Sequence, residues 1–169
     1  MEQAHFPGWK PFMRSVRPRP TAYDDSVVKA TTKEILKRLP RYGIAYSGDE
    51  EAVESIERAI LVNSSGYNVC RDLEWDGWDM EDERVADVFM GTYSLRDRVL
   101  QEEIARWVED TQAEPKFEIG QKVRFVAGKV VTEGVVFKIY RPQAQYGVRI
   151  DDTERVLRLV DYEKCEAVA

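Results

Sequence analysis

Hydrophobic positions recur with helical spacing over the first two-thirds of the chain. Candidate N-caps at residues 24–26 predict a first amphipathic helix, which Pro40 ends. A second helix is indicated more strongly, because Ser47 and Glu50 form a capping box. Its apolar stripe is Val53, Ile56, Ala59 and Ile60, and its acidic side is Glu50, Glu51, Glu54 and Glu57. Two amphipathic helices are therefore expected first.

The next stretch has a less regular pattern. Residues 67–75 are too short and too weakly periodic for a clear assignment, and a strand is preferred there. Two further helices are predicted over residues 81–90 and 94–109, separated by Gly91 and Thr92. The buried face of the longer helix is expected to be Leu100, Ile104, Trp107 and Val108.

From Phe117 onward the hydrophobic pattern has a period of two. The alternating positions are Val123 and Phe125, then Val135, Phe137 and Ile139, then Val148 and Ile150, then Leu157 and Leu159. Such short antiparallel strands are too few for a normal sandwich but can curl into a barrel. We expect an α+β protein with an extended basic arm (1–22), a mainly helical acidic domain (23–114) and a small antiparallel β-barrel (115–169).

Three segments of the last third of the chain carry a family resemblance. They are FEIGQKVRF at 117–125, EGVV at 133–136 and YGVRI at 146–150. This succession resembles the Src-homology-three-like small barrels, including the Tudor and KOW-type modules. The resemblance implies a binding module, but it does not select among RNA, peptides, modified side chains and proteins as ligands. Residues 1–114 resemble no family known to us.

Charge is strongly segregated along the chain. Residues 49–114 hold nineteen acidic and six basic side chains, a balance of −13, whereas residues 1–48 carry +5 and residues 115–169 carry +2. Clustered charge of one sign creates a field that selects partners, so we expect an acidic surface that attracts a basic protein. Imitation of nucleic-acid phosphate is one mechanism that needs such a surface. An ordinary solvated face is the alternative.

The loop after residue 71 concentrates the candidate chemistry. A calcium loop of the EF-hand type would take Asp72, Glu74, Asp76 and Glu83 as ligands, with Gly77 at its sharp turn. Alternatively, this is an acidic loop whose Asp79, Glu81 and Asp82 lie at a helix N-terminus, where the macrodipole favours anions. Trp75 and Trp78 form either a binding hot spot or part of the core. The candidate partner-binding residues are Glu50, Glu54, Glu57, Asp72, Glu74, Trp75, Asp76, Trp78 and Asp79.

Two basic regions flank the acidic domain. Arg14, Arg17 and Arg19 lie among prolines in an arm that either reaches nucleic acid or docks on its own protein, and the acidic segment downstream favours docking. On the barrel, the candidate ligand-binding residues are Tyr140, Arg141, Tyr146 and Arg149, although Tyr146 can equally pack at a strand start.

Catalytic signatures are scarce in this sequence. His5 is the single histidine, so His-based triads and zinc sites have no support, and no glycine-rich phosphate loop or cofactor motif occurs. We expect no cofactor, no membrane span and a cytoplasmic protein with reduced cysteines.

The expected function is noncatalytic binding of a macromolecular partner, and an accessory protein or phage-like inhibitor of a nucleic-acid-processing complex fits this design. Two alternatives stay open. One is direct DNA or RNA binding through the arm and barrel, and the other is a carboxylate-based or metal-dependent enzyme.

Overall fold

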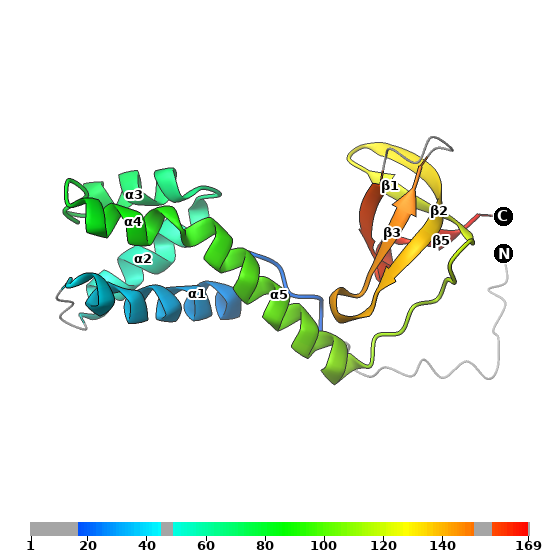
Figure 1. Ribbon diagram of the computed structural model, residues 1–169, viewed down its shortest axis with the longest axis horizontal. Coiled ribbons are helices and arrows are strands. Elements are labelled where there is room, and N and C mark those ends of the chain that lie inside the picture. The colour runs from blue at the N-terminus through cyan, green and yellow to red at the C-terminus, as the bar shows by residue number, and fades with distance from the viewer. Residues whose placement is uncertain (1–16, 45–48, 151–156, 169) are drawn as a thin grey trace, which may run out of the picture.

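The computed structural model describes residues 17–44, 49–150 and 157–168 (Figure 1). It confirms the α+β class, because a helical region is followed by an antiparallel sheet. The helices are α1 (Asp25–Arg38), α2 (Glu50–Val62), α3 (Gly66–Trp75), α4 (Glu83–Met90) and α5 (Thr92–Thr111), and a 3-10 turn, η1 (Leu39–Tyr42), follows α1. Asp49 rather than Ser47 caps α2, since its side chain accepts a hydrogen bond from the Glu51 N–H. Ser47 itself lies outside the described residues.

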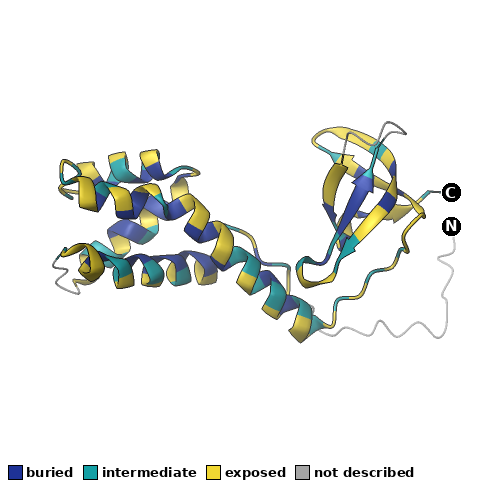
Figure 2. Cartoon of the chain, viewed as in Figure 1, coloured by how far each residue is buried: buried dark blue, intermediate teal, exposed yellow. Residues whose placement is uncertain are grey.

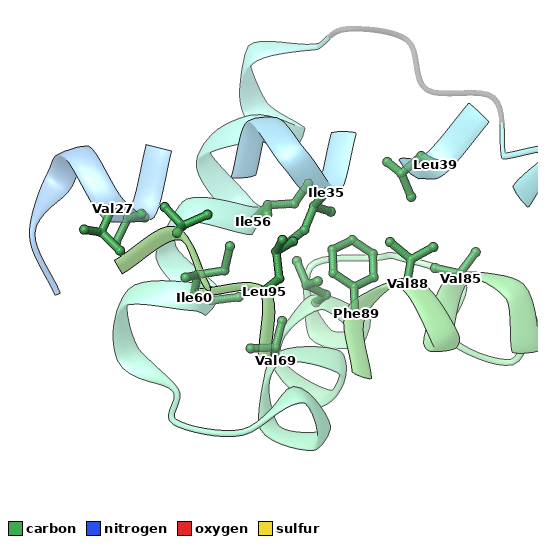
Figure 3. Packing of buried hydrophobic residues seen from close by; sticks show 14 residues of the cluster. Val27, Ile35, Leu39, Ile56, Ile60, Val69, Val85, Val88, Phe89 and Leu95 are labelled. Atoms are coloured by element: carbon green, nitrogen blue, oxygen red, sulfur yellow. The ribbon is translucent and has the colours of Figure 1, made fainter. Parts of the chain in front are cut away.

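The apolar stripes of the helices meet in one core (Figure 3). Val27 and Ile35 of α1, Ile56 and Ile60 of α2, and Phe89 of α4 are all completely buried. Full burial of such a side chain contributes about 1.5–3 kcal/mol. Figure 2 shows buried positions along the inward sides of the helices and exposed positions on their outward sides. The core thus fixes which side of each helix is available to a partner.

The preference for a strand over residues 67–75 is wrong, because this segment forms helix α3. Ser65 caps the helix by accepting a hydrogen bond from the Asn68 N–H, and the i and i+4 residues Val69 and Leu73 are buried. Gly66 allows the helix to begin against α4, since a Cβ at this position would lie 2.2 Å from the Met90 carbonyl oxygen. Packing against α4 therefore decides the conformation of a segment with a weak local pattern.

The sheet has five antiparallel strands in the order β4-β3-β2-β1-β5. They are β1 (Lys122–Ala127), β2 (Val130–Tyr140), β3 (Gln145–Arg149), β4 (Leu157–Asp161) and β5 (Glu166–Ala167). The predicted closed barrel is not formed, because β4 and β5 are both edge strands in the described part of the chain. Strand β5 has two residues, which pair with Val123 and Arg124 of β1.

The predicted inward positions of β2 and β4 are also corrected. Val136 is completely buried, whereas Val135 and Phe137 are 36% and 48% exposed. On β4, Val160 is buried while Leu157 and Leu159 are more than half exposed. The pairing of β2 with β3 is also irregular between Val136 and Lys138, and this irregularity changes which residues of β2 point inward. A shift of one residue moves every side chain to the other face, so the sheet has an apolar outer face as well as an apolar core.

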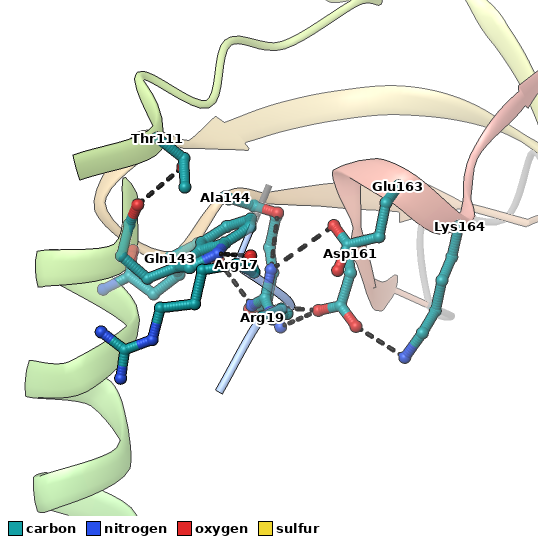
Figure 4. Close-up of polar contacts among 10 residues, drawn as sticks. Arg17, Arg19, Thr111, Gln143, Ala144, Asp161, Glu163 and Lys164 are labelled. Atoms are coloured by element: carbon teal, nitrogen blue, oxygen red, sulfur yellow. Dashed lines mark hydrogen bonds and ion pairs between the residues drawn. The ribbon is translucent and has the colours of Figure 1, made fainter. Parts of the chain in front are cut away.

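The two regions meet at a polar joint between α5 and the sheet (Figure 4). The Trp107 indole N–H of α5 donates to the Arg17 carbonyl oxygen at 2.7 Å, and its ring packs in the hydrophobic core of the sheet. Arg19 donates to the Gln143 carbonyl oxygen at 2.6 Å and pairs with Asp161 at 3.1 Å. The arm therefore docks on its own protein as expected, but the charge of Arg19 is matched by Asp161 of the sheet and not by the acidic segment, and Arg17 contributes its carbonyl oxygen while its side chain is exposed. Arg14 lies outside the described residues.

Candidate functional site

A groove of about 580 Å³ lies between α2 and the end of α3. Its charged lining is Asp49, Glu51, Glu54, Asp76 and Arg58, and Ala52, Ser55, Trp75 and Trp78 complete it. Four carboxylates thus face a single guanidinium. We call this feature the acidic groove. It brings together four of the predicted partner-binding residues, namely Glu54, Trp75, Asp76 and Trp78.

Asp76 anchors the wall of the acidic groove. Its carboxylate accepts hydrogen bonds from the Ser55 hydroxyl at 2.6 Å and from the Arg58 guanidinium, so it joins α2 to the end of α3. The hydrogen bond from Ser55, followed by that from Arg58, lowers the pKa of Asp76. This carboxylate therefore stays ionised, but its charge is already matched by Arg58.

Glu51 and Glu54 have a different environment. Both are exposed, and no ion pair joins either of them to a cation within the described ranges. Their negative charge is therefore available to a partner. The sequence pattern could not distinguish these two residues from Asp76, because engagement by Arg58 depends on how α2 and α3 pack.

The two tryptophans of the acidic groove differ in burial. Trp78 is half-buried, and its ring meets Phe89 of the core edge-on with centroids 5.4 Å apart. Trp75 is 77% exposed, and the Arg71 guanidinium lies 5.5 Å from its ring centroid. Trp78 therefore supports the groove, whereas Trp75 presents a large apolar surface to solvent.

The other predicted acidic residues do not line the acidic groove. The Asn63 side-chain amide donates two hydrogen bonds, one to the Asp72 carboxylate at 2.7 Å and one to the Ala59 carbonyl oxygen at the end of α2. Glu50 and Glu57 lie elsewhere on α2, and Glu74 lines a second groove between α3 and α4. Asp79 lies in the turn before α4, where its carboxylate accepts from the Glu81 N–H.

The structure does not form the predicted calcium loop. Asp72 and Glu74 lie on helix α3, Asp76 is bound to Ser55 and Arg58, and Glu83 begins α4. Gly77 does make a turn with φ of 91°. Among the residues placed by the structure, no group of three or more histidine, cysteine, aspartate or glutamate side chains is arranged to hold a metal ion.

Arg96 is a structural residue that the sequence pattern did not single out. It is 5% exposed, and its guanidinium donates to the carbonyl oxygens of Ile60 and Asn63 at 2.8 and 2.9 Å. It also lies 5.5 Å from the ring centroid of Tyr23. Arg96 therefore satisfies carbonyl groups at the end of α2, which otherwise lack intrahelical partners.

The predicted barrel site is divided between the two faces of the sheet. Tyr146 is completely buried, and its hydroxyl accepts a hydrogen bond from the Phe117 N–H at 3.1 Å. Tyr140 and Arg149 lie on the outer face, where Arg149 stacks on Phe137. Arg141 is exposed in the 3-10 turn η2 (Arg141–Gln143), next to α5. Tyr146 therefore packs in the core, which was the alternative to a ligand-binding role.

The cysteine thiols are both free. Burial raises the pKa of Cys165 to about 11, and burial also raises the pKa of Cys70. Both groups are therefore protonated near neutral pH, whereas a reactive cysteine needs its thiolate form.

Comparison with known proteins found no match, since no family model, no curated protein and no solved structure matches this chain. Among the helices that the structure describes, none combines the length and the apolar content needed to cross a bilayer.

Proposed function

We propose that this is a noncatalytic binding protein whose acidic groove captures a basic surface on a macromolecular partner. The observation that carries the proposal is Trp75, which is 77% exposed at a groove where Glu51 and Glu54 have free carboxylates. A large aromatic side chain supplies contact area, and the carboxylates accelerate encounter with a basic surface. The small sheet, with its resemblance to Src-homology-three-like modules, adds a second set of contacts.

The partner class follows from charge. Basic protein surfaces that carry unpaired lysines and arginines are typical of nucleic-acid-handling proteins. Carboxylates of the acidic groove would occupy the phosphate-binding positions of such a basic surface. The role we propose is therefore an accessory protein or phage-like inhibitor acting in the cytoplasm. Asp72 and Asp76 already accept hydrogen bonds from neighbouring side chains. The partner would therefore contact the remaining carboxylates of the acidic groove, at one end of the helical region.

The test is capture of partners from the native host by the full-length protein, with quantitative mass spectrometry. The doubly charge-reversed variant Glu51→Lys/Glu54→Lys should lose the basic partner, since it reverses the free carboxylates of the acidic groove. Glu109→Lys/Glu114→Lys is the matched control, because both residues are exposed and lie at or beyond the end of α5. Equal loss of the partner with both double variants would mean that net charge, and not the acidic groove, determines binding.

The contribution of Trp75 is tested separately, with the partner that the capture identifies. Trp75→Ala should weaken its binding by about 2 kcal/mol, or roughly 30-fold, as expected for an exposed aromatic hot spot. The affinity is measured by isothermal titration. Tyr93→Ala is the control, because Tyr93 is another exposed aromatic residue outside the acidic groove. An unchanged affinity for Trp75→Ala would contradict the assigned role.

A further inference from the structure

The outer face of the sheet carries side chains that the core does not use. Direct pairing places Lys122, Val135, Arg149 and Leu157 in one row across four strands, and directly paired residues share a face. Leu159 lies two residues beyond Leu157 on the same face, and both leucines are more than half exposed. This row defines a continuous surface over β1 to β4, which we call the outer sheet face.

Two aromatic rings on the outer sheet face each lie next to the cationic group of a neighbouring side chain. The Arg149 guanidinium lies 4.5 Å from the ring centroid of Phe137, and the Lys138 ammonium lies 4.6 Å from that of Tyr140. A Cβ at position 147 would lie 3.3 Å from the Tyr140 ring, so Gly147 leaves room for this ring to lie across β3. Each ring of this face therefore lies beside a positive charge.

The charge balance of the outer sheet face is positive. Its cations are Lys122, Arg124, Lys138 and Arg149. Its strand carboxylates are Glu133, which pairs with Arg124 at 2.9 Å, Glu166 of β5, which lies directly opposite Arg124, and Asp161, which is already bound by Arg19 and Lys164. The acidic groove lies on the helical region, which occupies the opposite end of the molecule from the sheet (Figure 1). A polyanion can therefore approach this face without meeting the free carboxylates of Glu51 and Glu54.

We propose that single-stranded nucleic acid binds across the outer sheet face. Bases stack on exposed aromatic rings and on guanidinium planes, and neighbouring cations contact the phosphates. Phe137 with Arg149 and Tyr140 with Lys138 each combine these two functions within one pair. The exposed leucines of β4 extend the apolar surface on which a base can rest. Unstacked bases are needed for these contacts, so a single strand fits the face better than a duplex.

A protein partner is a less complete match to the same surface. It would need carboxylates spaced to match the cations of this face in addition to apolar side chains for Leu157 and Leu159. A single strand supplies a phosphate and a base at every step, and it does so without a particular sequence. The inference does not depend on the acidic groove, because the two surfaces share no residue.

The experiment is a fluorescence anisotropy titration of the full-length protein with labelled oligo-dT and oligo-U of about 20 nucleotides, a length that exceeds the site of one small domain. Binding should weaken as NaCl rises from about 50 to about 200 mM, with a slope of log K against log salt of about −2 to −3, as expected for three or four phosphate contacts to a single strand. Phe137→Ala should lower the affinity roughly 5- to 150-fold. Arg149→Gln should reduce the salt slope by about 0.7.

The controls separate this surface from the others. Tyr67→Ala and Arg58→Gln remove an exposed aromatic ring and a cation from the helical region, and both should leave oligonucleotide binding unchanged. Glu51→Lys/Glu54→Lys, which tests the acidic groove, should not weaken it either. Circular dichroism checks that each variant is folded.

Three results would overturn the proposal. They are no oligonucleotide binding at the lowest salt, equal affinity of wild type and Phe137→Ala, and tighter binding of duplex than of single strands. If the oligonucleotides do not bind but Phe137→Ala loses a captured protein, the outer sheet face belongs to a protein partner and the nucleic-acid inference is wrong.

Discussion

Individual polar side chains at the ends of helices have roles that depend on their burial. Asn63, Asp72 and Arg96 all act at the end of α2, where Arg96 donates to two carbonyl oxygens and Asn63 joins Asp72 to the helix. Asp72 was predicted as a partner-binding residue from its charge and as a calcium ligand from its spacing. The pattern of residues could not reveal its structural role, because Asn63 approaches it only after α2 and α3 pack together.

Arg96 gives a prediction of stability. Arg96→Met should lower the free energy of unfolding by about 2–4 kcal/mol, because two carbonyl oxygens lose hydrogen bonds to a buried charged donor. Arg98→Met is the matched control on the same helix. Arg98 is 55% exposed and its ion pairs are on the surface, so this change should cost less than about 1 kcal/mol. Urea unfolding measures both values, and equal losses would contradict the role of Arg96.

At the scale of elements, sequence patterns predicted location better than orientation. The long periodic segments became α1, α2 and α5, and the alternating segments became strands. By contrast, the weakly periodic segment that forms α3 was assigned to the wrong type of structure. The runs of consecutive apolar residues in β2 allowed either face to be buried, and only pairing with β3 placed Val136 inside and Phe137 outside.

The approach of α3 to α4 leads to a prediction about two glycines. Gly66→Ala should destabilise the protein by about 1–3 kcal/mol, because its Cβ would overlap the backbone of Met90. Gly91→Ala should instead stabilise it by about 0.4–1 kcal/mol, because this glycine has a helical conformation and room for a methyl group. Thermal unfolding of the two variants checks the difference in sign. Stabilisation by Gly66→Ala would show that the close contact with α4 is absent in solution.

At the scale of the whole molecule, the joint at Arg19 and Asp161 couples the helical region to the sheet. Both side chains are largely buried, with 13% and 14% of their surfaces exposed. Burial raises the pKa of Asp161, but hydrogen bonds from Lys164 and Gln145 and the positive charge of Arg19 outweigh it and lower the pKa overall. The charged carboxylate is therefore the form that the folded joint favours.

The depressed pKa of Asp161 predicts a pH dependence of stability. Its contribution is fully present above the unfolded-state pKa of about 4 and is lost as the pH falls through the lower folded-state pKa. Wild type should therefore lose more stability than Asp161→Asn between about pH 5 and pH 2. Near neutral pH, Asp161→Asn should be less stable by about 1–3 kcal/mol. Urea titrations followed by circular dichroism check this, and parallel pH profiles would contradict it.

The sequence by itself determined the succession of a helical region and a strand region, the segregation of charge and the scarcity of catalytic signatures, because periodicity and composition are local properties. It also placed Trp75 and Tyr140 among the candidate binding residues. Only the tertiary structure decided which carboxylates stay free, which tryptophan is exposed and which face of the sheet carries Phe137 and Arg149. The physical reason is that burial and pairing depend on neighbours brought together from distant parts of the chain, as Ser55 and Arg58 are brought to Asp76.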